Sequence, residues 1–312
     1  MENFTTNIEN RLDLTMTQAR EKWSFRLLDS GNYKLTGFNC SDTTVYIPSS
    51  INGIKVESLR EGLFENRKKI ETVYISEGIT TISSSSFSNC RKLKEVYYPS
   101  TLKSVEMSAF YNSKKLETFK AITESNLEII KKYAFFKCEK LKYIDISTNI
   151  KDIEYSALTT YSLKLNKYEN LFYLGNNENP YLVLIKTTYN YEKYLNDKNH
   201  KKLLEDTEKI DILLKTKDKE EYNRLMKELF DDKTTNFTIH PSTKIIYTDA
   251  FNKCVNLKEI TIPDSVEVIK EHAFSDCENL TTVNYGKNLK IIEDGAFCYC
   301  PNLKYVRRII WK

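Results

Sequence analysis

The sequence predicts a solenoid of about nine coils, with short parallel strands along one face and turns or short helical turns along the other. The first observation is a repeated Ala-Phe pair, whose phenylalanines stand 23 residues apart at Phe251, Phe274 and Phe297. The second is that the same step separates three upstream phenylalanines, Phe64, Phe87 and Phe110. A fixed period in the twenties means that each unit buries its apolar face only against its neighbours.

Each repeat unit begins with a short strand, and one of the C-terminal units shows it most clearly. Apolar Ile260 and Ile262 alternate with polar Glu259 and Thr261, which is the period of two expected for a strand with one buried face. Pro263 ends this strand, because proline cannot donate a hydrogen bond to a neighbouring strand. Further apolar residues continue inward on the return path to the Ala-Phe pair.

Cysteine usage follows the repeat. Five of the seven cysteines occupy one slot, three residues after a repeat phenylalanine: Cys90, Cys138, Cys254, Cys277 and Cys300. A disulfide framework does not require cysteines at one fixed position of the repeat. A small buried apolar residue does recur at a fixed position, and free cysteine serves that role well. We therefore expect a ladder of reduced, structural cysteines.

The full repeat pattern, L-x-x-I-x-I-P-x-x-V-x-x-I-x-x-x-A-F-x-x-C, resembles the BspA-like class of leucine-rich repeats. The opening segments 31–37 and 44–48 resemble the N-terminal cap of that class, and 173–185 resembles an irregular unit of its bacterial members. The resemblance covers roughly 30–188 and 234–308. It implies a curved leucine-rich-repeat solenoid, usually found in surface proteins that bind ligands of a host or of neighbouring cells.

Four segments are expected along the chain. Residues 1–30 are predicted to form an N-terminal cap over the open end of the core, which solenoids need. Residues 31–188 and 234–312 are predicted to be two leucine-rich-repeat arrays. Between them, 189–233 lacks Gly and Pro, is dense in Lys and Glu, and has apolar residues at spacings of three, four and seven. That pattern predicts an inserted αα-hairpin.

The insertion 189–233 leaves three interpretations open. It could be a tolerated insertion that packs its apolar stripe on a coil, a helical arm that docks a partner or a second copy, or a disordered segment. An insertion confined to one unit often marks the functional side of a repeat array. The chain is accordingly expected to be a monomer or an oligomer assembled through the insertion.

Composition excludes several classes of partner. The net charge is +4, from 47 basic and 43 acidic residues, which is too even to indicate nucleic acid or an anionic membrane as the partner. No stretch approaches the roughly 18 apolar residues of a membrane helix. The N-terminus does not resemble a secretory signal. The chain as it stands is expected to be cytoplasmic, or at the cell surface if a leader is missing or export is unconventional.

Catalytic and metal-binding motifs are absent from the sequence. It contains no G-x-S-x-G, G-x-G-x-x-G, P-loop or H-E-x-x-H pattern. His240 and His272 fall at unrelated phases of their repeats, and we expect them to be exposed loop residues. Cys298 and Cys300 form a C-x-C pair, but no second pair exists, so a zinc site is not expected. We expect no enzyme activity, no cofactor and no metal.

The exposed face of the strands is the candidate binding surface. Residues between and before the two apolar strand positions point away from the core and form columns across neighbouring strands. The candidate ligand-binding residues in these columns are Tyr46, Tyr74, Glu95, Tyr97, Tyr143 and Asp145. Tyrosine is common at binding hot spots because it loses little rotamer entropy. Cross-strand aromatic pairs also stabilise a sheet without any ligand, so both interpretations stay open.

Two functions follow from these observations. The first is a non-enzymatic scaffold, adhesin-like by the family resemblance, that binds a protein or a glycan on the exposed strand face. The second is an intracellular structural or oligomerising module that contacts its partners through the helical insertion.

Overall fold

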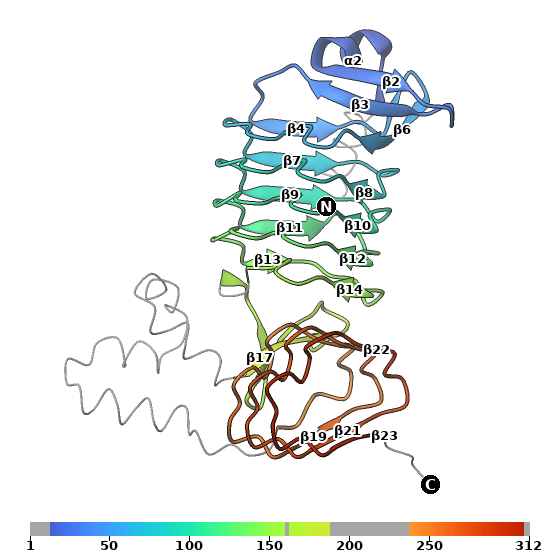
Figure 1. Cartoon of the computed structure of the whole chain (residues 1–312). Helices are drawn as coiled ribbons and strands as arrows, with labels where there is room; N and C mark the ends of the chain where they lie inside the picture. Colours follow the sequence, from blue (N-terminus) through green and yellow to red (C-terminus); the bar gives the residue numbers. More distant parts are fainter. Residues whose placement is uncertain (1–12, 160–161, 188–236, 309–312) are drawn as a thin grey trace, which may run out of the picture. The chain divides into compact units, whose positions relative to one another are not determined.

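The computed structural model describes residues 13–159, 162–187 and 237–308. The expected αα-hairpin at 189–233 lies outside these residues, as does the start of the expected N-terminal cap. The chain divides into two compact units, Met1–Lys164 and Leu165–Lys312, which we call the N-terminal array and the C-terminal array. Each contains stacked coils linked by parallel strand pairing, which confirms the predicted solenoid (Figure 1).

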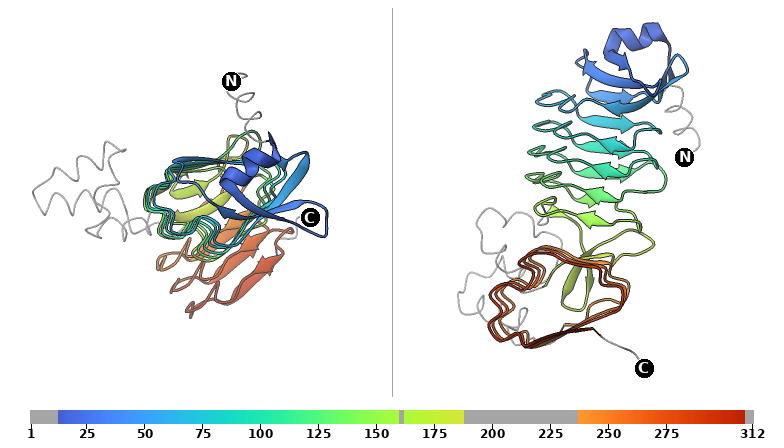
Figure 2. Two further views of the ribbon diagram at one scale, coloured as in Figure 1. Left: turned by 90° about the horizontal axis from the view of Figure 1, so that it is seen from above. Right: turned by 45° about the vertical axis from the view of Figure 1, so that its right-hand side comes forward.

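The N-terminal array carries a parallel sheet on the face that the sequence predicted. Its strands follow one another in the order of the chain: β4 (Thr44–Ile47), β7 (Thr72–Ile75), β9 (Glu95–Tyr98), β11 (Thr118–Ala121) and β13 (Tyr143–Ile144). In each strand apolar residues point into the core and polar or aromatic residues point out. Seen along the stack, the coils overlie one another (Figure 2).

A second, narrower sheet forms on the return path, where the sequence predicted only turns. Its strands are two residues long: β8 (Thr81–Ile82), β10 (Ser104–Val105), β12 (Ile129–Ile130) and β14 (Asp152–Ile153). Strands this short leave no alternation to detect in the sequence. They nevertheless bury one isoleucine or valine per coil against the wider sheet.

The N-terminal end of this array is covered by a separate five-stranded sheet and one helix. The strands are β1 (Asp13–Leu14), β2 (Trp23–Leu27), β3 (Tyr33–Phe38), β5 (Ser50–Ile51) and β6 (Ile54–Leu59). Helix α2 (Met16–Lys22) starts at Thr15, whose hydroxyl oxygen accepts a hydrogen bond from the Gln18 N–H in a capping box. Trp23 is buried, and its ring lies 6.0 Å from that of Phe64, the first phenylalanine of the repeat.

The C-terminal array opens with an antiparallel hairpin and continues as parallel coils. Its larger sheet runs through β15 (Asn166–Tyr168), β16 (Leu171–Leu174), β17 (Val183–Thr187), β18 (Ile245–Ile246), β20 (Val268–Ile269) and β22 (Ile291–Ile292). Its other sheet contains β19 (Glu259–Ile262), β21 (Thr282–Tyr285) and β23 (Tyr305–Arg308). Because β17 pairs in parallel with β18, the segment around 166–187 belongs to this array.

Each coil reverses at its back through two residues in the left-handed backbone region, one on each side of the Ala-Phe pair. Around Phe87 these are Ser85 (φ 56°) and Asn89 (φ 57°). The left-handed region costs roughly 1–2 kcal/mol for a residue with a side chain. Hydrogen bonds between coils offset that cost, as where the Phe87 N–H donates to the Ala109 carbonyl at 2.7 Å. The short helical turns expected at these positions are thus left-handed turns; among the described residues, α2 is the one α-helix.

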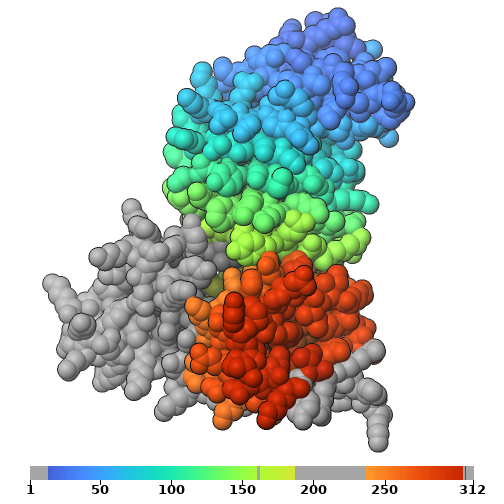
Figure 3. Space-filling model, viewed as in Figure 1, coloured from blue at the N-terminus to red at the C-terminus, as the bar shows by residue number. Residues whose placement is uncertain are grey.

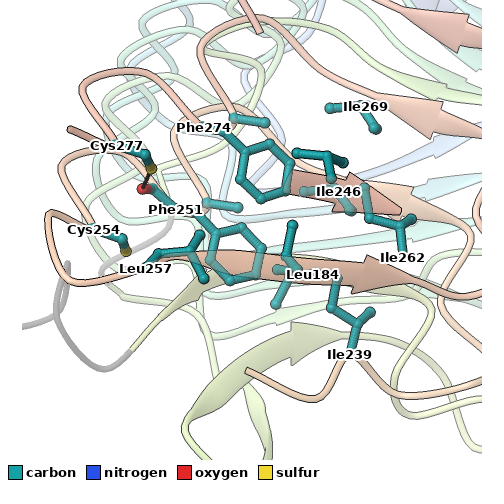
Figure 4. Packing of buried hydrophobic residues seen from close by; sticks show 14 of the residues in the cluster. Leu184, Ile239, Ile246, Phe251, Cys254, Leu257, Ile262, Ile269, Phe274 and Cys277 are labelled. Atoms are coloured by element: carbon teal, nitrogen blue, oxygen red, sulfur yellow. Dashed lines mark hydrogen bonds between the residues drawn. The ribbon is translucent and has the colours of Figure 1, made fainter. Parts of the chain in front are cut away.

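Stacked phenylalanines form the centre of each core. The rings of Phe87 and Phe110 lie 5.1 Å apart with 4° between their planes, and those of Phe110 and Phe135 are equally close. In the C-terminal array, Phe251 and Phe274 stack at 4.7 Å (Figure 4). All five side chains are fully buried. The repeat spacing therefore acts through one continuous aromatic stack in each array.

The cysteine slot supplies a hydrogen-bond donor as well as a small side chain. The Cys138 thiol donates to the Phe110 carbonyl of the preceding coil at 3.1 Å. Cys277 donates likewise to Phe251 (Figure 4), while Ser113 occupies the same slot and donates its hydroxyl to Phe87 at 2.7 Å. All seven cysteines are free thiols. The sequence prediction rested on burial alone. The position therefore requires a hydrogen-bond donor in addition to the small buried side chain that was predicted.

Candidate functional site

Strand pairing brings three tyrosines into one row on the outer face of the N-terminal array. The registers pair Tyr46 with Tyr74 and Tyr74 with Tyr97 across β4, β7 and β9. Their ring centroids are 5.0 and 4.9 Å apart, and the planes differ by 7° and 8°. All three side chains are partly exposed. We call Tyr46, Tyr74 and Tyr97 the tyrosine row.

The environment favours the neutral phenols of Tyr74 and Tyr97. Burial raises the pKa of Tyr74, and the neighbouring Tyr97, Tyr46 and Glu95 raise it further. Burial and the Glu95 carboxylate raise the pKa of Tyr97 in the same way. Tyr74 and Tyr97 therefore present uncharged hydroxyl groups at physiological pH, which suits hydrogen bonding better than ionic contact.

The same column continues through Lys120 to Asp145, and the character of the surface changes there. Lys120 pairs with Tyr97 in the register and is exposed. Asp145 lies at the predicted position, but its Oδ2 accepts a hydrogen bond from the Ala121 N–H at 3.1 Å. Partial burial raises the pKa of Asp145. The sequence predicted a carboxylate that is open to a ligand. In the structure this carboxylate instead links two coils through its hydrogen bond.

The neighbouring column contains the other two candidate residues. Register pairs Glu95 with Thr118 and Thr118 with Tyr143, so Tyr143 lies two strands from β9. Tyr143 is 48% exposed, and the Lys164 Nζ atom lies 4.9 Å from its ring centroid. The structure therefore places Glu95 beside the tyrosine row and separates Tyr143 from it.

The equivalent column of the C-terminal array has a different chemistry. Thr238 pairs with Thr261, and Thr261 pairs with Asn284. These side chains are short and polar, and no aromatic ring precedes Arg307 in this column. The two columns thus occupy the same position of the repeat but carry different side chains. The C-terminal column is therefore a suitable reference for experiments on the tyrosine row.

The predicted cysteine ladder lies inside the coils except at Cys300, which is partly exposed. Cys90, Cys138 and Cys277 are fully buried, and Cys254 nearly so. Burial raises the pKa of Cys90 to about 12 and raises that of Cys138 as well. The slot cysteines of the N-terminal array therefore stay protonated, as donation to a carbonyl requires.

Sequence reasoning missed an aromatic cluster with lysines on the turn side of the N-terminal array. The Phe136 ring lies 6.1 Å from that of Tyr111 and 5.5 Å from that of Tyr133. The ammonium groups of Lys137 and Lys132 lie 5.7 and 5.1 Å from the Tyr111 and Tyr133 rings, within cation–π range. Tyr111 and Phe136 each directly follow a repeat phenylalanine, and this was the available signal.

Successive coils contribute successive layers to the surface of each array, so the columns above run across layers (Figure 3). Among the described residues, no helix is long and apolar enough to cross a membrane. Within the same residues, no group of three or more His, Cys, Asp or Glu side chains is arranged to hold a metal ion.

Comparison with solved structures finds several leucine-rich repeat proteins. One is a leucine rich cell surface protein of Faecalibacterium prausnitzii, at 16% identity over 92% of this chain and 92% of that one, with a TM-score of 0.38. Another is the pneumococcal vaccine antigen PcpA, at 15% identity over 90% of this chain and 78% of that one, with a TM-score of 0.42. A leucine-rich repeat protein of Bacteroides ovatus matches at 18% identity, over 91% and 92%, with a TM-score of 0.26.

Comparison with curated proteins gives no significant match. The family comparison is decisive: the BspA type leucine rich repeat region matches in six copies over residues 57–177 and 224–308. These segments make up most of the chain and contain most of the coils of both arrays. The chain belongs to the BspA-type leucine-rich repeat family.

Proposed function

We propose that the chain is a non-enzymatic binding scaffold whose tyrosine row takes a protein ligand. One observation carries the proposal: Tyr46, Tyr74 and Tyr97 stack across three neighbouring strands and remain partly exposed. Tyrosine offers a large contact area at a low cost in side-chain entropy. The parallel sheet beneath holds the three rings in fixed positions, so little ordering is left to do when a ligand binds.

The ring geometry favours a protein over a glycan. Sugars pack against open aromatic faces, whereas both faces of Tyr74 are covered, by Tyr46 at 5.0 Å and by Tyr97 at 4.9 Å. A ligand can reach only the ring edge and the hydroxyl side of Tyr74. Edges and neutral hydroxyls in a line match the apolar groups and hydrogen-bonding groups of a polypeptide surface.

The competing explanation is that the stack serves the sheet alone. Cross-strand aromatic pairs contribute roughly 0.2–1 kcal/mol each to sheet stability without any ligand. The two explanations differ in what the double variant Tyr74→Asp/Tyr97→Asp should lose. A binding role predicts the loss of a ligand, and a purely stabilising role predicts only a small loss of stability.

The test immobilises the full-length chain and offers it an array of purified proteins and an array of glycans. We expect a protein to be retained, and we expect Tyr74→Asp/Tyr97→Asp to weaken its binding by about 30-fold or more, since a single hot-spot side chain already contributes about 2 kcal/mol or more. The urea unfolding midpoint, measured in parallel, should move little.

The matched control is Thr261→Asp/Asn284→Asp, which adds the same charges at the equivalent column of the C-terminal array. This control should bind as the unmodified chain does. Equal binding by the tyrosine double variant would remove the tyrosine row as the site. A glycan ligand that is lost with the same variant would keep the surface and refute the choice of a protein.

A further inference from the structure

A thiol, an imidazole and a carboxylate meet on two adjacent coils of the C-terminal array. The Cys298 Sγ atom lies 3.3 Å from Nδ1 of His272. The other ring nitrogen of His272, Nε2, lies 3.3 Å from Oε1 of Glu271. The sequence predicted His272 to be an exposed loop residue, because it and His240 fall at unrelated phases of their repeats; its contact with Cys298 spans 26 residues of the chain.

Coil stacking explains why the groups meet. Cys298 follows Phe297 as Ser275 follows Phe274, so the two side chains lie one above the other. The Cys298 Sγ lies 3.1 Å from the Ser275 hydroxyl oxygen, which is a second acceptor for the thiol proton beside Nδ1 of His272. His272 occupies the first left-handed position of its turn, with φ 58°. Gly295 packs tightly against the ring: a methyl group there would lie 3.1 Å from Cε1 and 3.3 Å from Nδ1 of His272. Backbone packing therefore holds the imidazole in place.

The polarity of the contacts gives each group a role. The Glu271 carboxylate can only accept a hydrogen bond, so it favours the tautomer with the proton on Nε2 of His272. Nδ1 then carries a lone pair directed at the Cys298 thiol. The Glu271 backbone N–H in turn donates to Oε2 of Glu293 at 2.9 Å, which holds the residue on its coil.

Cys298 differs from the four buried ladder cysteines, Cys90, Cys138, Cys254 and Cys277, in the two respects that govern thiol reactivity. The ladder thiols donate to backbone carbonyls inside the coils, as Cys138 does to Phe110, whereas Cys298 faces a nitrogen that can accept its proton. Cys298 is also partly exposed, and the His272 side chain is 38% exposed. Thiolate character and access decide which cysteines react.

We propose that Cys298 is a reactive thiol that hydroperoxides oxidise to a sulfenic acid, with His272 as the proton acceptor and Glu271 as a positioning residue. Nδ1 of His272 takes the thiol proton, and the sulfur attacks the terminal peroxide oxygen. The S–O bond forms while the O–O bond breaks. The leaving oxygen takes the proton from Nδ1 and departs as water or an alcohol. Sulfur loses the two electrons that the peroxide gains.

The experiment measures the rate at which hydrogen peroxide converts each cysteine of the full chain to a sulfenic acid, trapped with dimedone and located by peptide mass spectrometry. Cys300 is replaced by serine in all the proteins compared, so that Cys298 is the one cysteine of its peptide. Serine is chosen because it already occupies the ladder slot at Ser113. Cys40 serves as an internal reference, since it is also a partly exposed free thiol and its Sγ lies 4.0 Å from a backbone carbonyl.

We expect Cys298 to react faster than Cys40, and His272→Asn to slow Cys298 by about 100-fold, the lower end of the range for a positioned proton acceptor. Asparagine is chosen because it tolerates the left-handed backbone of residue 272. Thermal unfolding of the variant should match that of the parent. Cys298 reacting no faster than Cys40, or equally fast in His272→Asn, would overturn the proposal.

The role of Glu271 has its own test. Glu271→Leu removes the acceptor for the Nε2 proton and should slow the oxidation of Cys298. Glu271→Gln keeps an oxygen acceptor at the same reach and should restore the rate. Equal rates in all three proteins would show that Glu271 does not position the imidazole.

Discussion

At the scale of single residues, Cys138 shows how one side chain meets two demands of a coil. Its volume fills a fully buried gap, and its thiol gives the Phe110 carbonyl a second hydrogen-bond donor beside the Ser113 N–H, which lies 3.1 Å away. Serine at 113, in the same slot, makes the same bond to the carbonyl of Phe87. The slot therefore selects a small donor and not cysteine as such.

This account separates two substitutions of similar size. Cys138→Ala should lower the free energy of unfolding by about 0.5–1.5 kcal/mol, because the Phe110 carbonyl then loses one of its two donors. Cys138→Ser keeps a donor and should cost less. Urea unfolding followed by circular dichroism measures both; alanine proving no worse than serine would show that the hydrogen bond is unimportant.

At the scale of elements, the stacked phenylalanines connect each coil to the next. Phe110 is fully buried between Phe87 and Phe135, with centroids 5.1 Å away on both sides. In a repeat array the interfaces between neighbours supply much of the stability. Removing one ring should therefore weaken two interfaces at once.

Phe110→Ala is accordingly expected to cost about 3–5 kcal/mol, the usual range for a buried phenylalanine. Hydrogen exchange should report faster exchange at β9, β11 and the strands beside them. The coils around Phe251 in the C-terminal array provide the reference within the same sample. Uniform acceleration throughout the chain would contradict a nearest-neighbour description.

At this scale, the repeat pattern of the sequence predicted which strand residues lie side by side, but it did not predict the side-chain contacts between coils. Counting by two placed Tyr46, Tyr74 and Tyr97 in one row, because a strict repeat sets the strand register. The same counting could not show that Asp145 turns to the Ala121 N–H, since a rotamer decides that. The contact of His272 with Cys298 depends on left-handed turns that the sequence does not reveal.

At the scale of the whole molecule, the family membership and the tyrosine row lead to an expectation about where the chain works. An adhesin-like scaffold has to meet its ligand outside the cell. Protease treatment of intact cells should then release peptides of this chain, detectable by mass spectrometry. A cytoplasmic marker protein controls for lysis. Complete protection until lysis would instead favour an intracellular scaffold.

The coil between Phe110 and Phe135 is two residues longer than its neighbours, yet the two rings stack at the same 5.1 Å as Phe87 and Phe110. The added length lies in the corner after Ala121, where Ser125 accepts a hydrogen bond from the buried Tyr98 hydroxyl at 2.9 Å. Corners can thus grow or shrink during evolution while the sheet and the stack keep their phase. New loops could be grafted at this corner without redesigning the face that carries the tyrosines.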